Sequence, residues 1–210
     1  MENPVIILGA QQTGINALDI FNSNNVVVYC FLDDDAQLHQ TEIHNVPVLG
    51  STDEDEYLKI LGKKCEVFIA IDDTSVRKSM AAKLKEDYQQ VPVNAIHKYS
   101  YVSEQAWLGH GIMVNAGAVV QANSKIGDNC FIHANAVVEA GATLGEYVNI
   151  GAGAIINANA QIADNAFIGS GAVIVGGVKI GKKARIGAGS VVVADVPANQ
   201  TVFGNPAQKV

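Results

Sequence analysis

The stretch Ile150-Gly-Ala-Gly-Ala-Ile-Ile-Asn-Ala-Asn-Ala-Gln-Ile-Ala-Asp-Asn-Ala-Phe-Ile168 repeats one six-residue pattern. An aliphatic residue opens each hexad, and a small residue stands four positions later. Outward from this stretch, every sixth residue is aliphatic at sixteen successive positions: Val102, Leu108, Val114, Val120, Ile126, Ile132, Val138, Leu144, Ile150, Ile156, Ile162, Ile168, Ile174, Ile180, Ile186 and Val192. A helix has a period near 3.6 and a strand a period of 2, so neither element explains the pattern.

A triangular coil does explain a period of six. Each hexad supplies one short strand and one corner, the aliphatic side chain points inward, and the small residue with Gly or Asn lets the chain turn. Three hexads complete one turn of the coil, so residues 102–192 form about five turns. The sequence therefore predicts an all-β parallel solenoid whose coils stabilise one another by stacking.

The first half of the chain has a different pattern. Residues 4–8 are apolar and end in Gly9–Gly14, after which apolar residues recur at helical spacing. Further strands are expected over 26–32, 67–71 and 91–96, and a helix over 77–88. Alternating strands and helices predict a Rossmann-like α/β domain with a parallel sheet. We expect the boundary at residue 97, with an α/β domain over 1–97 and the solenoid with a C-terminal cap over 98–210.

Ligands of such sheets bind beyond the carboxyl ends of the strands. Those ends carry Gly9–Gly14, Asp33–Asp35 and Asp72–Thr74. A nucleotide-type ligand and a bare strand-to-helix turn both explain the two glycines of the first segment.

Composition excludes several classes of function. The net charge is −7, and residues 1–100 hold 15 Asp and Glu against 8 Lys and Arg. Because no basic stripe is present, nucleic acid is not an expected partner. No apolar run is long enough for membrane insertion, so a cytoplasmic protein is expected. The three scattered cysteines favour buried reduced thiols. No metal site is expected, since His110 and His133 are not separated by a whole number of coils.

The two parts together resemble the bacterial hexapeptide-repeat sugar O-/N-acyltransferases of the sialic-acid and bacillosamine pathways. The stretches that carry this resemblance are Ile6–Ala10, Phe31–Asp34, Phe68–Ile71 with Arg77-Lys78, Ile96-His97, Ile126–Cys130, Val138-Glu139, Leu144–Tyr147 and Val202–Ala207. The resemblance implies a left-handed parallel β-helix, acetyl-CoA as acyl donor, and a sugar or nucleotide-linked amino sugar as acceptor. It also implies a homotrimer with CoA sites between neighbouring solenoids.

The same resemblance assigns candidate binding residues. The sugar or nucleotide-sugar substrate would contact Gln11, Gln12 and Thr13 in the glycine turn, Asp33 and Asp34 after the second strand, and Asp72 after the third, where the family favours Gly. Asn149 stands at the position that contacts the thioester end of CoA. Ser170 and Ala188 stand at further CoA-contacting positions in the corners of the coil.

In the family a His acts as general base in a direct acyl transfer, so no nucleophilic Cys is needed. Ala140 stands at the position of this base here, and Gly141 at the position of its carboxylate partner. His133 is the histidine nearest in sequence and is the candidate catalytic base; a solvated corner residue is the other interpretation. Three hypotheses stay open: a sugar acyltransferase with a relocated base, a catalytically silent homologue that binds nucleotide sugar or CoA as a scaffold in surface-polysaccharide assembly, and a purely structural trimer.

Overall fold

The computed structural model describes residues 3–210. The chain divides between Lys98 and Tyr99 into two compact units. Within the described residues, no helix combines the length and the apolar character that a membrane crossing requires.

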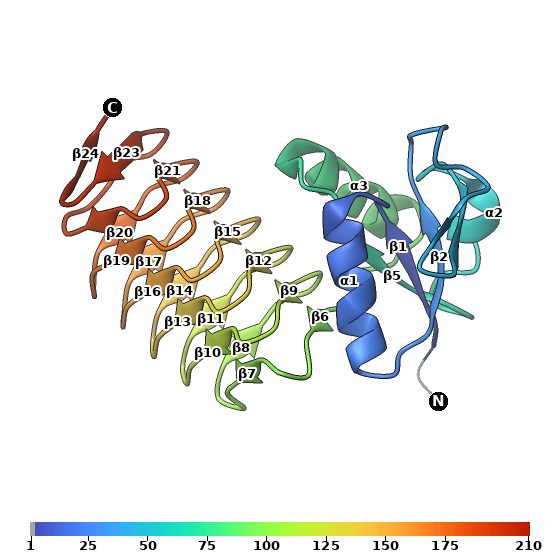
Figure 1. The fold of residues 1–210 in the computed structure, drawn as a ribbon, viewed down its shortest axis with the longest axis horizontal. Coiled ribbons are helices and arrows are strands. Elements are labelled where there is room, and N and C mark those ends of the chain that lie inside the picture. Colours follow the sequence, from blue (N-terminus) through green and yellow to red (C-terminus); the bar gives the residue numbers. More distant parts are fainter. Residues whose placement is uncertain (1–2) are drawn as a thin grey trace. The chain divides into compact units, whose positions relative to one another are not determined.

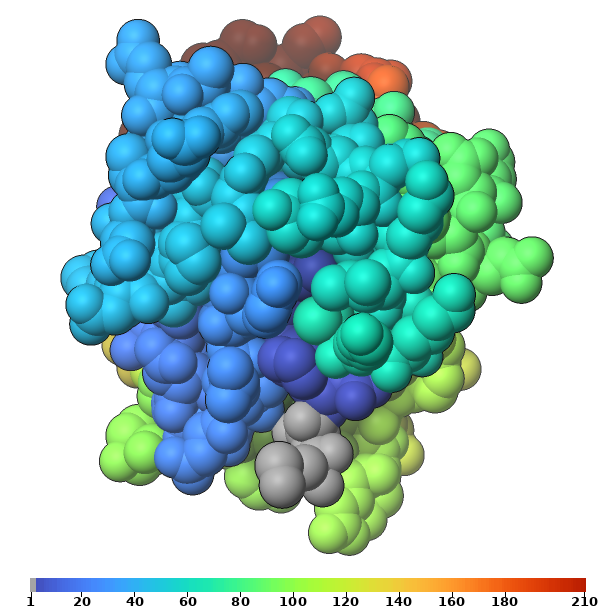
Figure 2. Space-filling view, turned by 90° about the vertical axis from the view of Figure 1, so that its right-hand side faces the viewer, coloured from blue at the N-terminus to red at the C-terminus, as the bar shows by residue number. Residues whose placement is uncertain are grey.

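The first unit is a Rossmann-like α/β fold, as the alternation of elements predicts (Figure 1). Its sheet has the order β3-β4-β2-β1-β5, in which β3 pairs antiparallel with β4 and the remaining pairs are parallel. Figure 2 shows one face of this unit, coloured blue to teal. Its elements are β1 (Val5–Leu8), α1 (Gln12–Ser23), β2 (Val28–Leu32), β3 (Glu42–Ile43), β4 (Val46–Gly50), α2 (Asp55–Leu58), β5 (Glu66–Ile69), α3 (Thr74–Asp87) and β6 (Ala95–Ile96).

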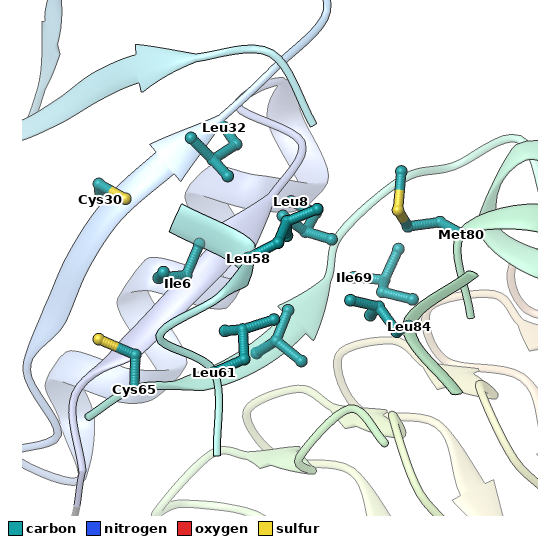
Figure 3. Close-up of a cluster of buried hydrophobic side chains, with 11 residues drawn as sticks. Ile6, Leu8, Cys30, Leu32, Leu58, Leu61, Cys65, Ile69, Met80 and Leu84 are labelled. Atoms are coloured by element: carbon teal, nitrogen blue, oxygen red, sulfur yellow. The ribbon is translucent and has the colours of Figure 1, made fainter. Parts of the chain in front are cut away.

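A cluster of buried hydrophobic side chains covers one face of the sheet in this unit (Figure 3). Alternate residues of β1, β2 and β5 share one face of the sheet, and side chains of α2 and α3 cover them. The members are Ile6, Leu8, Cys30, Leu32, Leu58, Leu61, Cys65, Val67, Ile69, Met80 and Leu84. All three cysteines are free and buried, as predicted. Burial, with a smaller contribution from nearby Cys65, raises the pKa of the Cys30 thiol to about 12, so this thiol is neutral at physiological pH.

Two details of the first unit differ from the sequence prediction. The strand expected over 91–96 exists only as β6. The Val93 N–H donates to the Val67 carbonyl at 2.8 Å, but the chain then leaves the sheet for α1, where Ile96 O accepts from Asn24 Nδ2 at 2.8 Å. The β3–β4 hairpin was not predicted, although its turn residues His44 and Asn45 have φ of 49° and 66°, which is typical of a tight hairpin turn.

The second unit is the predicted left-handed parallel β-helix, seen in Figure 1 as a stack of coils. From β7 to β19, each strand pairs in parallel with the strand three further along the chain. The strands are β7 (Tyr101–Val102), β8 (Trp107–Leu108), β9 (Met113–Val114), β10 (Val119–Val120), β11 (Lys125–Ile126), β12 (Phe131–Ile132), β13 (Val137–Val138), β14 (Thr143–Leu144), β15 (Asn149–Ile150), β16 (Ile155–Ile156), β17 (Gln161–Ile162), β18 (Phe167–Ile168), β19 (Val173–Ile174), β20 (Lys179–Ile180), β21 (Arg185–Ile186) and β22 (Val191–Val192).

These strands form the three sides of a prism. We call them the first sheet (β7, β10, β13, β16, β19, β22), the second sheet (β8, β11, β14, β17, β20) and the third sheet (β9, β12, β15, β18, β21). Every hexad aliphatic is the second residue of its strand, and from Val114 to Val192 these side chains are at most 4% exposed. The hexad prediction is therefore confirmed. The hairpin of β23 (Thr201–Gly204) and β24 (Ala207–Lys209) continues the third sheet beyond β21.

Three corners join the sheets, and each repeats once in every coil. The first corner follows the first sheet (residues 139–142, for example), and the second corner follows the second sheet (145–148). The third corner follows the third sheet (133–136). Because the coil has no insertion, a residue in a corner lies directly beside the residue eighteen positions away.

Candidate functional site

A cavity of about 240 Å³ opens in the first unit at the carboxyl ends of β1, β2 and β5. This is the edge at which parallel α/β sheets bind ligands. The structure brings four of the predicted substrate residues together there. The cavity is lined by Gly9, Gln11, Asp33, Asp34, Thr52, Ala70, Ile71, Asp72 and Val76.

Two aspartates that follow β2 form hydrogen bonds with the neighbouring segments that line this cavity. The Asp33 carboxylate is 8% exposed and accepts a hydrogen bond from the Ala10 N–H at 2.6 Å. Asp34 Oδ1 accepts from the N–H and the hydroxyl of Thr52 at 2.9 and 2.8 Å. The turn after β1, the end of β2 and the segment after β4 are thus held in fixed relation by charged hydrogen bonds.

The start of α1 meets the loop after β5. Gln11 is the N-cap of α1, and its side chain makes no capping hydrogen bond. The Thr13 hydroxyl instead donates to the Asp72 carboxylate at 2.5 Å. Gln12 is exposed and is not among the lining residues, so the structure places it outside the cavity. A Cβ on Gly14 would lie 2.1 Å from the Gly9 carbonyl oxygen, so only glycine allows this close approach of helix and turn.

The loop after β5 is fixed by two further residues. Asp73 is the N-cap of α3, and its carboxylate accepts from the N–H groups of Ser75 and Val76 at 2.8 and 3.0 Å. Arg77 is fully buried, and its Nη1 donates to the main-chain oxygens of Ile71 and Asp72 at 2.5 and 3.2 Å. The Arg77 guanidinium therefore holds the main chain of the loop in place through these two hydrogen bonds.

The predicted CoA residues lie along the third corner of the solenoid. His133, Ser170 and Ala188 occupy this corner in three different coils, and Asn149 lies on β15 in the adjoining third sheet. The His133 N–H donates to the Ile150 carbonyl at 3.0 Å. A Cβ built on Gly153, Gly171 or Gly189 of the same corner would meet no atom within 4 Å. At three successive levels this corner therefore has a glycine whose side-chain space is open.

The position of the usual base lies on a different edge. Ala140 and Gly141 are in the first corner, and the Glu139 carboxylate beside them accepts from the Ala158 N–H at 3.0 Å. The width of the first sheet separates this corner from the third corner. One chain by itself does not bring His133 next to Ala140.

Two basic residues of the last coils, Lys182 and Arg185, already make contacts within the protein. Lys182 pairs with Asp164 at 3.4 Å in the second corner. The guanidinium carbon of Arg185 lies 4.7 Å from the centre of the Phe167 ring on the third sheet, a cation–π contact. Among residues 3–210, no group of three or more His, Cys, Asp and Glu side chains is arranged to hold a metal ion.

Comparison with protein families agrees with both units. Residues 4–84 match the model of the PglD N-terminal domain, and residues 123–158 and 159–194 match the bacterial transferase hexapeptide model. A variant of perosamine N-acetyltransferase from Caulobacter crescentus, solved with CoA and GDP-perosamine, is 31% identical. The match covers 100% of this chain and 98% of that one, with a TM-score of 0.90. The chain belongs to the bacterial hexapeptide-repeat sugar acyltransferases.

Other members of this acyltransferase family have the same fold over their whole length. The acetyltransferase domain of PglB from Neisseria gonorrhoeae, solved with acetyl coenzyme A, is 28% identical, with a TM-score of 0.92. WeeI from Acinetobacter baumannii is 27% identical, with a TM-score of 0.87. Both matches cover 100% of each chain. A search of curated protein sequences found no match.

Two residue roles at the cavity of the first unit were missed from the sequence. Thr52 lies in the segment after β4, and Asp73 caps α3 beside the cavity. The rule that ligands bind past the ends of parallel strands would have found Thr52, because β4 ends at Gly50. The N-cap role of Asp73 could have been found from its position before the helical run.

Proposed function

We propose that the chain transfers an acetyl group from acetyl-CoA to an amine or hydroxyl group of a sugar. The observation that carries this proposal is the match of both units to perosamine N-acetyltransferase solved with CoA and GDP-perosamine. Such a sugar would serve in surface-polysaccharide or glycan synthesis. Use of acetyl-CoA places the proposed reaction in the cytoplasm.

The open third corner fits an extended donor such as CoA. An added Cβ at Gly153, Gly171 or Gly189 would meet open space, so this edge leaves room for a ligand, although the N–H groups of these glycines already donate to the neighbouring coil. Carbonyl oxygens at an exposed corner can accept from the amides of a pantetheine arm. In this proposal Ser170 and Ala188 contact the arm, and Asn149 lies near the thioester.

A homotrimer is proposed from the outward face of the first sheet. The first residue of each of its strands points out of the prism, and five successive ones are aliphatic and half-buried: Val119, Val137, Ile155, Val173 and Val191. Tyr101 at the start of the same column is 60% exposed. A continuous apolar stripe outside a solenoid marks a contact with another chain. Three first sheets around a three-fold axis would cover all three stripes.

This arrangement supplies a candidate active site. Around the axis, the third corner of one subunit lies beside the first corner of the next. His133 of one subunit would then face Ala140 and Gly141 of its neighbour at the same coil level. The methyl group of Ala140 and the absence of a side chain at Gly141 leave room for an imidazole from the adjoining chain.

The proposed step is a direct transfer. His133 takes a proton from the acceptor nitrogen or oxygen, which forms a bond to the thioester carbonyl carbon. The carbon–sulfur bond then breaks, and CoA leaves as a thiolate that takes up a proton. No covalent intermediate on the protein is required. The buried cysteines therefore have no part in the step.

Loss of the usual residues favours a second candidate function. Ala140 and Gly141 stand where the resemblance places the base and its carboxylate partner. A catalytically silent homologue that binds CoA or nucleotide sugar as a scaffold would have the same fold.

Release of free thiol from acetyl-CoA in the presence of amino sugars separates these functions. We expect sugar-dependent thiol release together with CoA binding measured by calorimetry. CoA binding with no thiol release for any acceptor would favour the scaffold. No CoA binding at all would contradict both and favour a structural trimer.

Ile155→Glu should convert the trimer to monomers, because three carboxylates would be forced together without water at the three-fold axis. Light scattering on a sizing column measures the effect, and the unchanged chain should have the mass of three subunits. Gln161→Glu is the matched control, since Gln161 is the outward residue of a strand in the second sheet. A monomeric unchanged chain, or a trimeric Ile155→Glu variant, would disprove this interface.

A further inference from the structure

Three groups around the cavity of the first unit are the ones that a phosphate of a nucleotide would use. They are the Ala10 N–H in the turn after β1, the Thr13 hydroxyl at the start of α1, and the first N–H groups of α3. Glycine turns and helix N-termini at this edge of a parallel sheet bind phosphate through such donors.

Each of these donors is already bonded to a carboxylate of the protein. Asp33 accepts from the Ala10 N–H at 2.6 Å, and Asp72 accepts from the Thr13 hydroxyl at 2.5 Å. Asp73 accepts from Ser75 and Val76 in the first turn of α3. A phosphate that bound at these points would have to displace a negative charge held in place by the chain.

All charged residues that line the cavity are acidic. Asp33, Asp34 and Asp72 are among its nine lining residues, and none of the nine is Lys, Arg or His. Arg77 is the nearest cation along the chain, but it is fully buried and donates to main-chain oxygens of the loop. Charge within the cavity therefore repels a diphosphate.

The size of the cavity agrees with a small ligand. At about 240 Å³ it lies below the roughly 300–1,000 Å³ of pockets for drug-sized ligands. Asp34 and Asp72 each have a second carboxylate oxygen that can accept from a hydroxyl or an ammonium group. A monosaccharide with an amine matches both the volume and the charge.

We infer that the cavity of the first unit binds a phosphate-free sugar, neutral or carrying an amine, and that Asp72 is the residue that excludes a nucleoside diphosphate. This inference rests on the proposed function, because it selects between the free and the nucleotide-linked acceptor. It assigns Asp72 a specificity role at a position where the family favours Gly.

Calorimetry on the full chain with two matched pairs of probes tests the inference. The pairs are glucosamine with glucosamine 1-phosphate, and guanosine with GDP. For the unchanged chain, we expect glucosamine to bind at least about tenfold more tightly than its phosphate. In Asp72→Asn, which removes one negative charge and leaves the Thr13 hydroxyl only a neutral acceptor, we expect GDP affinity to rise at least about tenfold.

Asp87→Asn is the control, because it removes one charge from an exposed residue of the same unit at the far end of α3. It should leave the binding of all four probes unchanged. Tight binding of GDP to the unchanged chain, or no gain of GDP binding in Asp72→Asn, would overturn the inference. Binding of none of the four probes to the unchanged chain would overturn it as well. CoA binding to the solenoid is measured separately, so failure here is distinct from failure of the proposed acetyl transfer.

Discussion

His133→Ala should lower the rate of acetyl transfer by about 10²- to 10⁴-fold, the usual contribution of a general base. CoA affinity should change little, because the open edge that would hold CoA is built from main chain and small side chains of later coils. His133 itself lies in a corner and is only half-buried, so its loss leaves the prism intact. Thiol release under single-turnover conditions measures the chemical step.

A second variant separates a catalytic role of His133 from a structural one. Ala140→His returns an imidazole to the usual position of the base, so in the His133→Ala background it should restore part of the lost rate. His110→Ala is the matched control, because His110 is an exposed histidine in the second corner whose main-chain N–H contacts Asp128. Full activity of His133→Ala would remove His133 from the mechanism. A loss of activity in His110→Ala equal to that in His133→Ala would do the same.

Ile150→Ala should lower the free energy of unfolding by about 2–5 kcal/mol. The Ile150 side chain is fully buried and stacks between Ile132 and Ile168 of the neighbouring coils. Removing it takes away the transfer free energy of the deleted carbons and leaves a cavity that the regular coils above and below cannot close. Urea denaturation at a fixed protein concentration measures the change.

Gln161→Ala is the control for this measurement, because Gln161 points outward from the second sheet and is exposed. Its effect should stay within about 0.5 kcal/mol, as for most surface substitutions. A loss for Ile150→Ala no larger than that of the control would show that the inward aliphatic column does not hold the coils together.

The solenoid was predictable almost residue by residue. In a regular coil the environment of a side chain depends only on its position in the hexad. The local pattern therefore predicts which residues of neighbouring coils stack on one another. The first unit was predictable in outline, because alternating apolar runs identify its strands. The strand expected over 91–96 was wrong in extent and in sheet: only the Val93 N–H bonds to β5, and β6 is not a strand of the sheet that contains β5. The sheet that a short apolar run joins depends on tertiary structure, which the local sequence does not state.

The candidate site was predictable only as a set of residues. The end-of-strand rule brought Asp33, Asp34 and Asp72 to one cavity edge. It could not show that Asp72 bonds Thr13 or that Asp33 bonds the Ala10 N–H, since these pairs are 59 and 23 residues apart in the chain. Gln12 and Thr13 were expected to contact the substrate and are not among the residues that line the cavity; a one-residue step on a helix turns a side chain by about 100°, so the residues that follow Gln11 cannot all face it.

The prism, the Rossmann-like sheet and the family could all be predicted from the order of the residues, because few folds satisfy a repeated apolar spacing. Only the folded chain shows that Asp33 accepts from the Ala10 N–H and Asp72 from the Thr13 hydroxyl. It also shows that His133 and Ala140 lie on different edges of the solenoid. These contacts are between residues far apart in the chain, so they form only after the strands have been placed side by side.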